Sequence, residues 1–536
     1  MTRDVNDSLR REIYRSKKVI VLLLLFMMIL VQGCSTGSAD DIDSAESNKE
    51  TGVNNGGTLK IVRGSDATSM DPHFVTNIST ADVLYQKVYE TLVVPDEDMN
   101  IQPNLAKEWE QIDDVTWEFK LEEDVKFHDG EPFNAEAVQK TFDRLLDPET
   151  GSPQADKIGM VEEIKIIDEY TVQFLLSEPY SPLLSILAAN EGSIISPKLI
   201  EEDPKEIANN PVGTGPFKFD NWESGDEILL TKNENYWGEE PHIDNVKFII
   251  VPEDATRIAM IETGEAHISD QIPVTEIDRI ENSPTLKMER AEGLGSEFIG
   301  FNTQKEPFDD VLVRKAISHA IERESIITGV FNGVGTLSTS TMSPKVSGFT
   351  ENVEPYEYDT NKAKTLLEEA GYSDGFELTL LTADFKERIN LAEVIQSQLK
   401  GINVDVNIQT LEYGAYIEAT DKGEGHMFNG SWGNATGDGD YNQYNLFHTN
   451  SMGTSGNLFF YSNEEVDHLI EEGRKEQDPK VRDDIYEETQ QIEMEDAVYV
   501  PIRTVEHLAA YNKDKVEGLN VSPVSYLILD DVKIIE

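Results

Sequence analysis

The sequence predicts an α/β protein built from two or three domains. Its 536 residues are more than one hydrophobic core usually organises, and a hydrophobic content of 38% is sufficient for globular folding. Segments with the alternating pattern of strands and segments with the apolar period of helices follow one another along most of the chain. Such a succession is typical of α/β domains.

The N-terminal segment predicts export and lipid attachment. A basic stretch at residues 10–18 precedes an unbroken apolar run at 19–31, which has the length of a signal-peptide core and is short for a membrane span. The chain's one cysteine, Cys34, ends the sequence Val-Gln-Gly-Cys, which resembles a bacterial lipobox. We therefore expect residues 1–33 to be a lipoprotein signal peptide that is removed before a lipidated Cys34. The alternatives are an uncleaved anchor and a plain secretory signal. The polar residues 34–56 predict a disordered linker.

The predicted elements follow in order along the rest of the chain. Helices are indicated by apolar residues at helical spacing, by N-cap residues at their start and by glycines at their end. Predicted strands cover residues 58–62, 116–121, 170–176, 228–232, 246–251, 286–289, 404–408, 499–503 and 527–535. Predicted helices cover residues 81–91, 255–263, 360–370 and 391–400, and others begin at Asn134, at Asp309 or Asp310, at the capping box 462–465 and at Asp478. A change of composition near residues 291–295 indicates a boundary, after which the pattern becomes more helical.

The charge of the chain excludes one class of partner. With 102 acidic against 45 basic residues, the formal net charge is −57, so general nucleic-acid binding, which needs a basic face, is excluded. The same charge argues against docking on anionic lipid headgroups. So many acidic residues predict a solvated surface that favours solubility at high salt or high pH and costs self-repulsion in dilute buffer. We therefore expect a salt-loving or alkali-loving source.

The sequence offers no motif for catalysis, for a metal or for a cofactor. Its nine histidines are scattered without metal-ligand spacing, and neither a G-x-S-x-G elbow nor a dinucleotide fingerprint is present. A glycosidase-type pair of carboxylates stays open because acidic residues are so numerous. We expect a protein that is not an enzyme, with no catalytic residue, no metal and no cofactor.

The least ordinary stretch of the sequence is residues 430–444. It holds four glycines, Trp432, two tyrosines and two acids, and it has neither a helical nor a strand period, so we expect a loop. Glycines allow a close backbone approach, aromatic rings provide stiff contact area and carboxylates accept from cations. The stretch is either a ligand-binding loop or a well-ordered surface turn around one buried Trp.

Several short motifs, taken together, resemble a known family. They lie at residues 105–109, 125–135, 210–217, 235–238, 300–303, 307–310, 313–317, 358–359, 363–371 and 461–467. The chain is similar to extracellular solute-binding proteins of bacterial ABC importers, of the large peptide/nickel class (family 5). The resemblance implies a two-lobed α/β fold of the periplasmic-binding-protein type (large class II) with the ligand enclosed between the lobes. It places lobe I at residues 57–289 with 500–536 returning to it, and lobe II at 290–499.

The resemblance also implies ligand-binding residues. In dipeptide- and oligopeptide-binding relatives an Asp three residues after the loop Trp holds the peptide ammonium, and here Ala435 stands at that spacing. The Arg that holds a dipeptide carboxylate aligns near Thr382, so it is missing too. The loop that contains Trp432 is more similar to the glutathione-binding branch. Two further loops, at residues 70–73 and 295–298, are expected to approach the ligand from the two lobes. The predicted ligand-binding residues are Met70, Asp71, His73, Gly295, Phe298, Trp432, Asn434, Thr436, Asp438, Asp440 and Tyr441.

Two roles within this set stay open. Either Asp438 or Asp440 binds the peptide ammonium in place of the missing Asp, or each caps its own turn. Lys386 and Arg388 are candidate carboxylate partners, or surface bases at a helix end.

The expected function is capture of short peptides, either di- or oligopeptides or glutathione, on the extracellular face of the cytoplasmic membrane. The expected partners are the peptide, the ABC permease subunits and the membrane that holds the lipid anchor, and the expected state is a monomer. The alternatives are a nickel chelate, an oligosaccharide or another small solute as ligand, an extracellular hydrolase, and a signalling or chaperone-like receptor without an importer.

Overall fold

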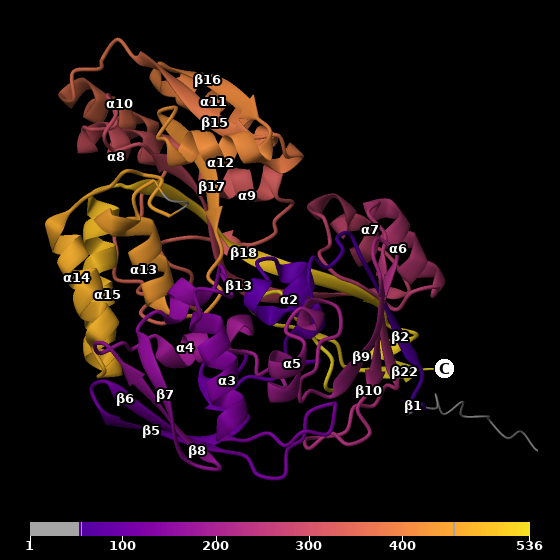
Figure 1. Ribbon diagram of the computed structural model, residues 1–536. Helices are drawn as coiled ribbons and strands as arrows, with labels where there is room; N and C mark the ends of the chain where they lie inside the picture. Colours follow the sequence, from indigo (N-terminus) through magenta and orange to yellow (C-terminus); the bar gives the residue numbers. More distant parts are fainter. Residues whose placement is uncertain (1–52, 55, 454–455, 536) are drawn as a thin grey trace, which may run out of the picture. The chain divides into compact units, whose positions relative to one another are not determined.

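The computed structural model describes residues 53, 54, 56–453 and 456–535 (Figure 1). The predicted signal peptide, Cys34 and most of the predicted linker lie outside the described residues. None of the helices within the described part is long and apolar enough to cross a membrane.

An eleven-stranded mixed sheet forms the main framework. Its strands are hydrogen-bonded in the order β16-β15-β17-β13-β18-β12-β2-β11-β10-β9, and β14 pairs with β18. The bounds are β16 Val404–Leu411, β15 Phe376–Ala383, β17 Met427–Trp432, β13 Leu286–Phe301, β18 Tyr499–Asn512, β12 Ile268–Ser269, β2 Thr58–Arg63, β11 Asn245–Ile250, β10 Glu227–Lys232, β9 Phe217–Glu223 and β14 Thr336–Leu337. Strands β11 and β12 pair with β2, and β16 and β17 with β15, in parallel, while the other pairs are antiparallel. A mixed α/β fold is therefore confirmed.

The two long strands β13 and β18 run side by side in the middle of this sheet (Figure 1). Their register shifts between Glu292 and Ser296 and again between Glu297 and Phe298, so the chain bulges there. The predicted boundary at 291–295 and the predicted loop at 295–298 both fall inside β13, and a loop there is wrong because pairing with β18 and β17 keeps this glycine-rich stretch extended.

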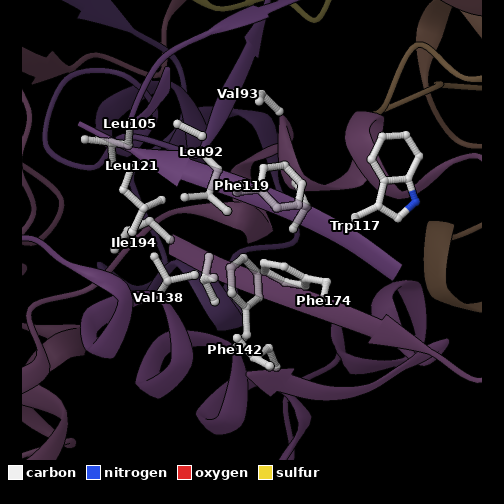
Figure 2. Packing of buried hydrophobic residues seen from close by; sticks show 14 of the residues in the cluster. Leu92, Val93, Leu105, Trp117, Phe119, Leu121, Val138, Phe142, Phe174 and Ile194 are labelled. Atoms are coloured by element: carbon white, nitrogen blue, oxygen red, sulfur yellow. The ribbon is translucent and has the colours of Figure 1, made fainter. Parts of the chain in front are cut away.

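A separate four-stranded antiparallel sheet, β5-β6-β8-β7, carries its own core. Phe119, on β6, and Phe174, on β8, meet edge to face with their ring centroids 5.3 Å apart, and Phe142 from helix α3 contacts Phe174 at 5.2 Å (Figure 2). The predicted alternation at 116–121 is confirmed, and Asn134 caps α3 by accepting from the backbone N–H groups of the first turn. The bounds are β5 Ala106–Asp113, β6 Thr116–Leu121, β7 Val161–Asp168, β8 Thr171–Leu176 and α3 Ala135–Leu146.

The remaining elements surround these two sheets. The helices are α2 Ile78–Leu84, α4 Leu183–Leu187, α5 Pro197–Glu202, α6 Asp254–Thr263, α7 Ile277–Glu281, α8 Val311–Ala320, α9 Arg323–Val330, α10 Thr360–Glu369, α11 Lys386–Leu399, α12 Tyr413–Asp421, α13 Gly439–Phe447, α14 Glu464–Lys475 and α15 Pro479–Glu495. Short 3-10 turns are η1 Pro72–Phe74, η2 Ala155–Ile158, η3 Asn190–Gly192, η4 Glu206–Ala208, η5 Val274–Glu276, η6 Lys400–Ile402 and η7 Thr449–Ser451. Small strands are β1 Val53–Asn54, β3 Val93–Pro95, β4 Ile101–Pro103, β19 Val516–Glu517, β20 Asn520–Val521, β21 Leu527–Ile528 and β22 Lys533–Ile535.

Other predicted elements also differ from the structure, three of them markedly. The helix at 81–91 is wrong in extent, because α2 ends at Leu84 and Gln86 turns the chain with a positive φ of 53°. The loop at 430–444 is wrong at both ends, because pairing with β13 extends β17 to Trp432 and Asp438 caps α13. The strand at 527–535 is two short strands, β21 and β22, that pair with different partners.

A buried charge cluster joins four parts of this framework. Arg63 at the end of β2 donates from Nη2 to Asp82 of α2 and to Asp270 after β12, both at 2.6 Å. Lys87 Nζ contacts the second oxygen of Asp82 at 3.1 Å, and the backbone N–H of Leu527 donates to that oxygen at 2.8 Å. Buried charges persist when they are paired and hydrogen-bonded, as they are here.

Candidate functional site

A cavity of about 510 Å³ lies where α2, η2, η3, β13, β17, β18 and the segment before β21 meet. Its lining residues are Val75, Thr76, Asn77, Ile78, Ala81, Gln154, Lys157, Asn190, Glu191, Leu294, Gly295, Ser431, Trp432, Gly433, Asn434, Ala435, Tyr441, Val505, His507, Pro523, Val524 and Tyr526. The set combines small, aromatic and polar side chains with few charges, which is typical of a small-molecule binding site.

Asn434 holds the loop at residues 433–438, whose residues 433–435 line the cavity. Its Oδ1 accepts from the backbone N–H groups of Thr436 at 2.9 Å and Gly437 at 2.7 Å, while its Nδ2 donates to the carbonyl of Asp438 at 2.8 Å. Gly437 adopts a φ of 76°, a conformation that favours glycine. The loop is thus fixed by its own side chains before any ligand binds.

Asp438 is engaged by an arginine from α15. Arg482 donates to both carboxylate oxygens, from Nη1 at 2.7 Å and from Nη2 at 2.6 Å, and Asp438 also accepts from the backbone N–H of Asp440 as the N-cap of α13. Arg482 further donates to the Gly473 carbonyl and the Tyr486 hydroxyl. Asp438 therefore ties the loop to two helices and does not line the large cavity.

Asp440 forms an ion pair with Arg474 of α14, without the two hydrogen bonds that Arg482 donates to Asp438. Asp440 Oδ1 lies 3.0 Å from Arg474 Nε, and the Arg474 guanidinium stacks over the Tyr444 ring at 3.9 Å. Burial raises the pKa of the Asp440 carboxyl to about 6, against the lowering effect of Arg474. Asp440, Thr436 and Tyr441 line a smaller cavity of about 270 Å³ that shares Lys157 and Tyr441 with the large one.

Trp432 ends strand β17 and lines the large cavity. Its ring centroid lies 5.5 Å from that of Tyr441, and its Nε1 is buried without a hydrogen-bond partner among the described residues. Gly295 faces it from β13, and a Cβ at that position would lie 2.8 Å from the Trp432 carbonyl oxygen. The glycine is therefore required for the close approach of the two strands.

An ion pair sits on the opposite wall. Lys157 Nζ lies 2.7 Å from Glu191 Oε1 and 5.7 Å from the centroid of the Tyr441 ring. Burial lowers the pKa of the Lys157 ammonium, but the Glu191 carboxylate raises it by more, so the pKa lies above its usual value. Beside Glu191, Asn190 Nδ2 donates to the Pro72 carbonyl at 3.3 Å, while Asn190 Oδ1 is buried without a partner among the described residues.

The second base of the lining, His507, is uncharged at neutral pH. Burial lowers the pKa of the His507 imidazole to about 4, against the raising effect of its hydrogen bond with Pro523. Among the described residues that line the cavity, the charged side chains at neutral pH are consequently Lys157 and Glu191.

The structure brings together part of the predicted set. Gly295, Trp432, Asn434 and Tyr441 line the large cavity. Phe298 lies in an aromatic core, with its ring centroid 4.7 Å from that of Tyr499.

The three residues predicted near η1 lie behind the cavity wall. Met70 is fully buried in a hydrophobic core, and Arg144 donates to the Asp71 carboxylate and lies 2.8 Å from His73 Nδ1. Burial, together with the nearby Arg144 charge, lowers the pKa of His73 to about 3. The neighbouring residues 75–78 line the cavity instead.

The candidate carboxylate partners take other positions. Arg388, near the start of α11, donates to the Asn429 carbonyl at 2.7 Å and to Ser431 Oγ at 2.8 Å, so it braces the strand that ends at Trp432. Thr382 is fully buried in β15. Neither Arg388 nor Lys386 is among the lining residues.

Sequence reasoning missed the residues that give the cavity its charge. Lys157, Asn190 and Glu191 lie in short 3-10 turns without a recognisable motif, and Glu191 is one of 102 acidic residues. Their shared position depends on how distant segments pack, so no local signal marks them. Within the described part of the chain, no group of three or more His, Cys, Asp or Glu side chains is arranged to hold a metal ion.

A mixed α/β framework with a cavity of small-molecule size is the architecture expected of a solute-binding protein of the periplasmic-binding-protein class. The family model for bacterial extracellular solute-binding proteins, family 5 (middle region), matches residues 100–454. The chain therefore belongs to the bacterial extracellular solute-binding proteins of family 5. It is the non-enzymatic, extracytoplasmic binding component of an ABC importer.

Individual relatives agree with this assignment. The glutathione-binding protein GsiB of Salmonella typhimurium is 30% identical over 477 residues, which cover 87% of this chain and 93% of GsiB. The periplasmic binding protein DppA of Helicobacter pylori, solved with the peptide STSA, is 31% identical with a TM-score of 0.75, over 90% of this chain and 99% of DppA. The oligopeptide-binding protein AppA of Bacillus subtilis, solved with a nonapeptide, is 26% identical with a TM-score of 0.73, over 90% of this chain and all of AppA.

Proposed function

We propose that the protein captures short peptides, glutathione among them, outside the cell and delivers them to the permease of an ABC importer. The observation that carries the proposal is the lining of the large cavity. It places one cation and one anion, Lys157 and Glu191, opposite two aromatic side chains, Trp432 and Tyr441. A short peptide is a zwitterion with amide groups between its ends, so it needs both signs of charge, polar donors and flat contact area.

The size of the cavity and the relatives support the same ligand class. A volume of about 510 Å³ lies within the range of about 300–1,000 Å³ that is usual for small-molecule sites. GsiB is named for glutathione, and the DppA and AppA structures hold peptides.

We further propose that the cavity lies between two lobes, residues 57–289 with 500–536 and residues 290–499. Support comes from the lining, which takes Glu191 and His507 from the first range and Leu294 and Trp432 from the second. A ligand that contacts both lobes favours the arrangement in which they close on it, because that arrangement has the higher affinity. The permease then recognises the closed arrangement.

We also propose that the mature chain is attached to the extracellular face of the cytoplasmic membrane through lipid on Cys34. Intact-mass analysis of protein from membranes tests this: we expect cleavage before Cys34 and the added mass of a lipid. In a Cys34→Ser variant the protein should leave the membrane fraction. An unmodified Cys34 in the mature protein would contradict the anchor.

The ligand class is tested by isothermal titration of the purified protein with a panel of solutes. The panel contains trialanine, glutathione, nickel with histidine, and a maltooligosaccharide, and mass spectrometry of each mixture checks for product. We expect saturable binding of trialanine or glutathione without product. Binding confined to the nickel complex or the sugar would overturn the peptide assignment, and turnover would overturn the binding-protein role.

A Trp432→Phe variant should lose the fluorescence change that accompanies binding.

A further inference from the structure

We propose that Glu191 and Asn190 hold the ammonium group of the peptide, in a site on η3 rather than on the loop that follows Trp432. The proposal rests on the peptide function above and specifies how the site recognises its ligand. The geometry assigns the ammonium to Glu191 and the adjacent Asn190 Oδ1, and gives Lys157 the role of a positioning residue.

The first argument is electrostatic. An ammonium group brought into a cavity loses its hydration, so it requires a carboxylate or several acceptors in return. Glu191 is the one carboxylate among the described residues that line the large cavity. Asp438 and Asp440 pair with Arg482 and Arg474 and do not line this cavity. Glu191 also has a cationic partner, Lys157, but it lines the cavity and is therefore within reach of a ligand.

The second argument concerns free acceptor capacity. A carboxylate can accept about four hydrogen bonds, and Lys157 Nζ accounts for one on Glu191 Oε1. Asn190 Nδ2 donates to the Pro72 carbonyl, so the Oδ1 atom of the same amide is left to accept from another group. This oxygen is buried and finds no donor among the described residues, and a buried acceptor without a donor is unfavourable. An ammonium has three donors, so it can satisfy Asn190 Oδ1 and Glu191 together.

The third argument concerns preorganisation. Asn190 and Glu191 belong to the same short turn, η3, both line the cavity and each is only about one-twentieth exposed, so packing restricts both side chains. The Lys157 ammonium fixes the Glu191 side chain from the other side at 2.7 Å. A rigid pair of acceptors binds a cation more tightly than flexible ones, because less conformational entropy is lost.

The test compares free and N-acetylated trialanine, which differ in the charged amine. In the wild-type protein, trialanine should bind about ten- to a hundredfold more tightly than N-acetyl-trialanine. This ratio corresponds to the usual contribution of hydrogen bonds to a charged group. Glu191→Gln should remove most of this preference by weakening trialanine while leaving the acetylated peptide nearly unchanged. The matched control is Glu227→Gln, which breaks the Lys247 ion pair in the strand pair β10–β11, outside the cavity lining, and should leave the preference intact.

The outcomes separate this inference from the function on which it rests. If Glu191→Gln keeps the wild-type preference for the free amine, the Glu191 site is wrong while the peptide function stands. If the wild-type protein binds neither trialanine nor glutathione, the peptide function fails and the amine site fails with it. Should Glu191→Gln not fold, as judged by circular dichroism, Asn190→Ala provides the test. It keeps the Glu191–Lys157 pair and should still reduce the preference severalfold, and an unchanged preference would overturn the inference.

Discussion

Replacing Arg482 by Met should destabilise the protein strongly, because the side chain neutralises a buried carboxylate at the base of the binding loop. Arg482 donates to both oxygens of Asp438, and the two side chains are only 12% and 5% exposed. Removing one partner of such a pair leaves an uncompensated charge and costs about 3–5 kcal/mol. The nearby Asp440 carboxylate adds repulsion, which places the expected loss toward the upper end of this range.

The assay is unfolding in urea followed by far-ultraviolet circular dichroism, with the free energy extrapolated to water. The matched control is Arg279→Met. Arg279 also pairs with a carboxylate, Glu262, at 2.7 Å, but the two side chains are 36% and 30% exposed, so the expected loss is below about 1 kcal/mol.

A double variant separates the charge effect from lost packing. Arg482→Met combined with Asp438→Asn should be more stable than Arg482→Met alone, because the amide can still cap α13 while no buried charge remains. The reasoning is refuted if Arg482→Met lowers the free energy of unfolding by no more than Arg279→Met does. It is also refuted if adding Asp438→Asn lowers the free energy of unfolding further. A different result, lower peptide affinity with unchanged stability in Asp438→Asn, would show that Asp438 contacts the ligand.

The remaining predictions concern stability. Arg63→Met should cost about 3–5 kcal/mol in the same assay, since Asp270 would lose its buried cation and Asp82 would keep only Lys87. A loss below about 1 kcal/mol would contradict this. Burial raises the pKa of the Glu493 carboxyl to about 8 from 4.5, so the native state holds a proton that the unfolded chain releases. Its stabilising effect is complete below pH 4.5 and is lost as pH rises through 8, at up to about 1.4 kcal/mol per pH unit. Glu493→Gln should remove this dependence of the unfolding free energy on pH. If variant and wild type show parallel pH profiles of unfolding free energy, Glu493 is not the group responsible. Finally, the net charge of −57 predicts that the melting temperature rises with salt concentration, because salt screens the self-repulsion. The Debye length falls from about 30 Å at about 0.01 M to about 3 Å at about 1 M salt. A melting temperature that stays flat over this range would count against the prediction.

The fold was predictable wherever local chemistry decides the structure. Asn134 and Asp478 start helices as their side chains indicate, and the alternation around Phe119 gives a half-buried strand. The misplaced elements lie where distant pairing prevails over local pattern. Gly295 and Gly430 indicate loops by composition, but neighbouring strands hold both extended.

The candidate site was predictable in its aromatic part and unpredictable in its charged part. Trp432 stands out in the sequence because tryptophan is rare and glycines flank it. Asp438 was one of two candidates for binding the peptide ammonium, but its partner Arg482 lies 44 residues further on, and nothing in either segment indicates the pairing. The Lys157–Glu191 pair is equally hidden, because it forms between two short turns 34 residues apart.

The hydrogen bond from Leu527 to Asp82 has a consequence for biosynthesis. It joins residues 445 positions apart, and strand β18 lies between β13 and β12, which precede it by some two hundred residues or more. While the ribosome is still producing the middle of the chain, Asp82 lacks one of its donors and the central sheet lacks a strand. Contacts of such long sequence separation also form slowly. The nascent chain therefore cannot complete its core before the last residues of β18 and β21 have been synthesised.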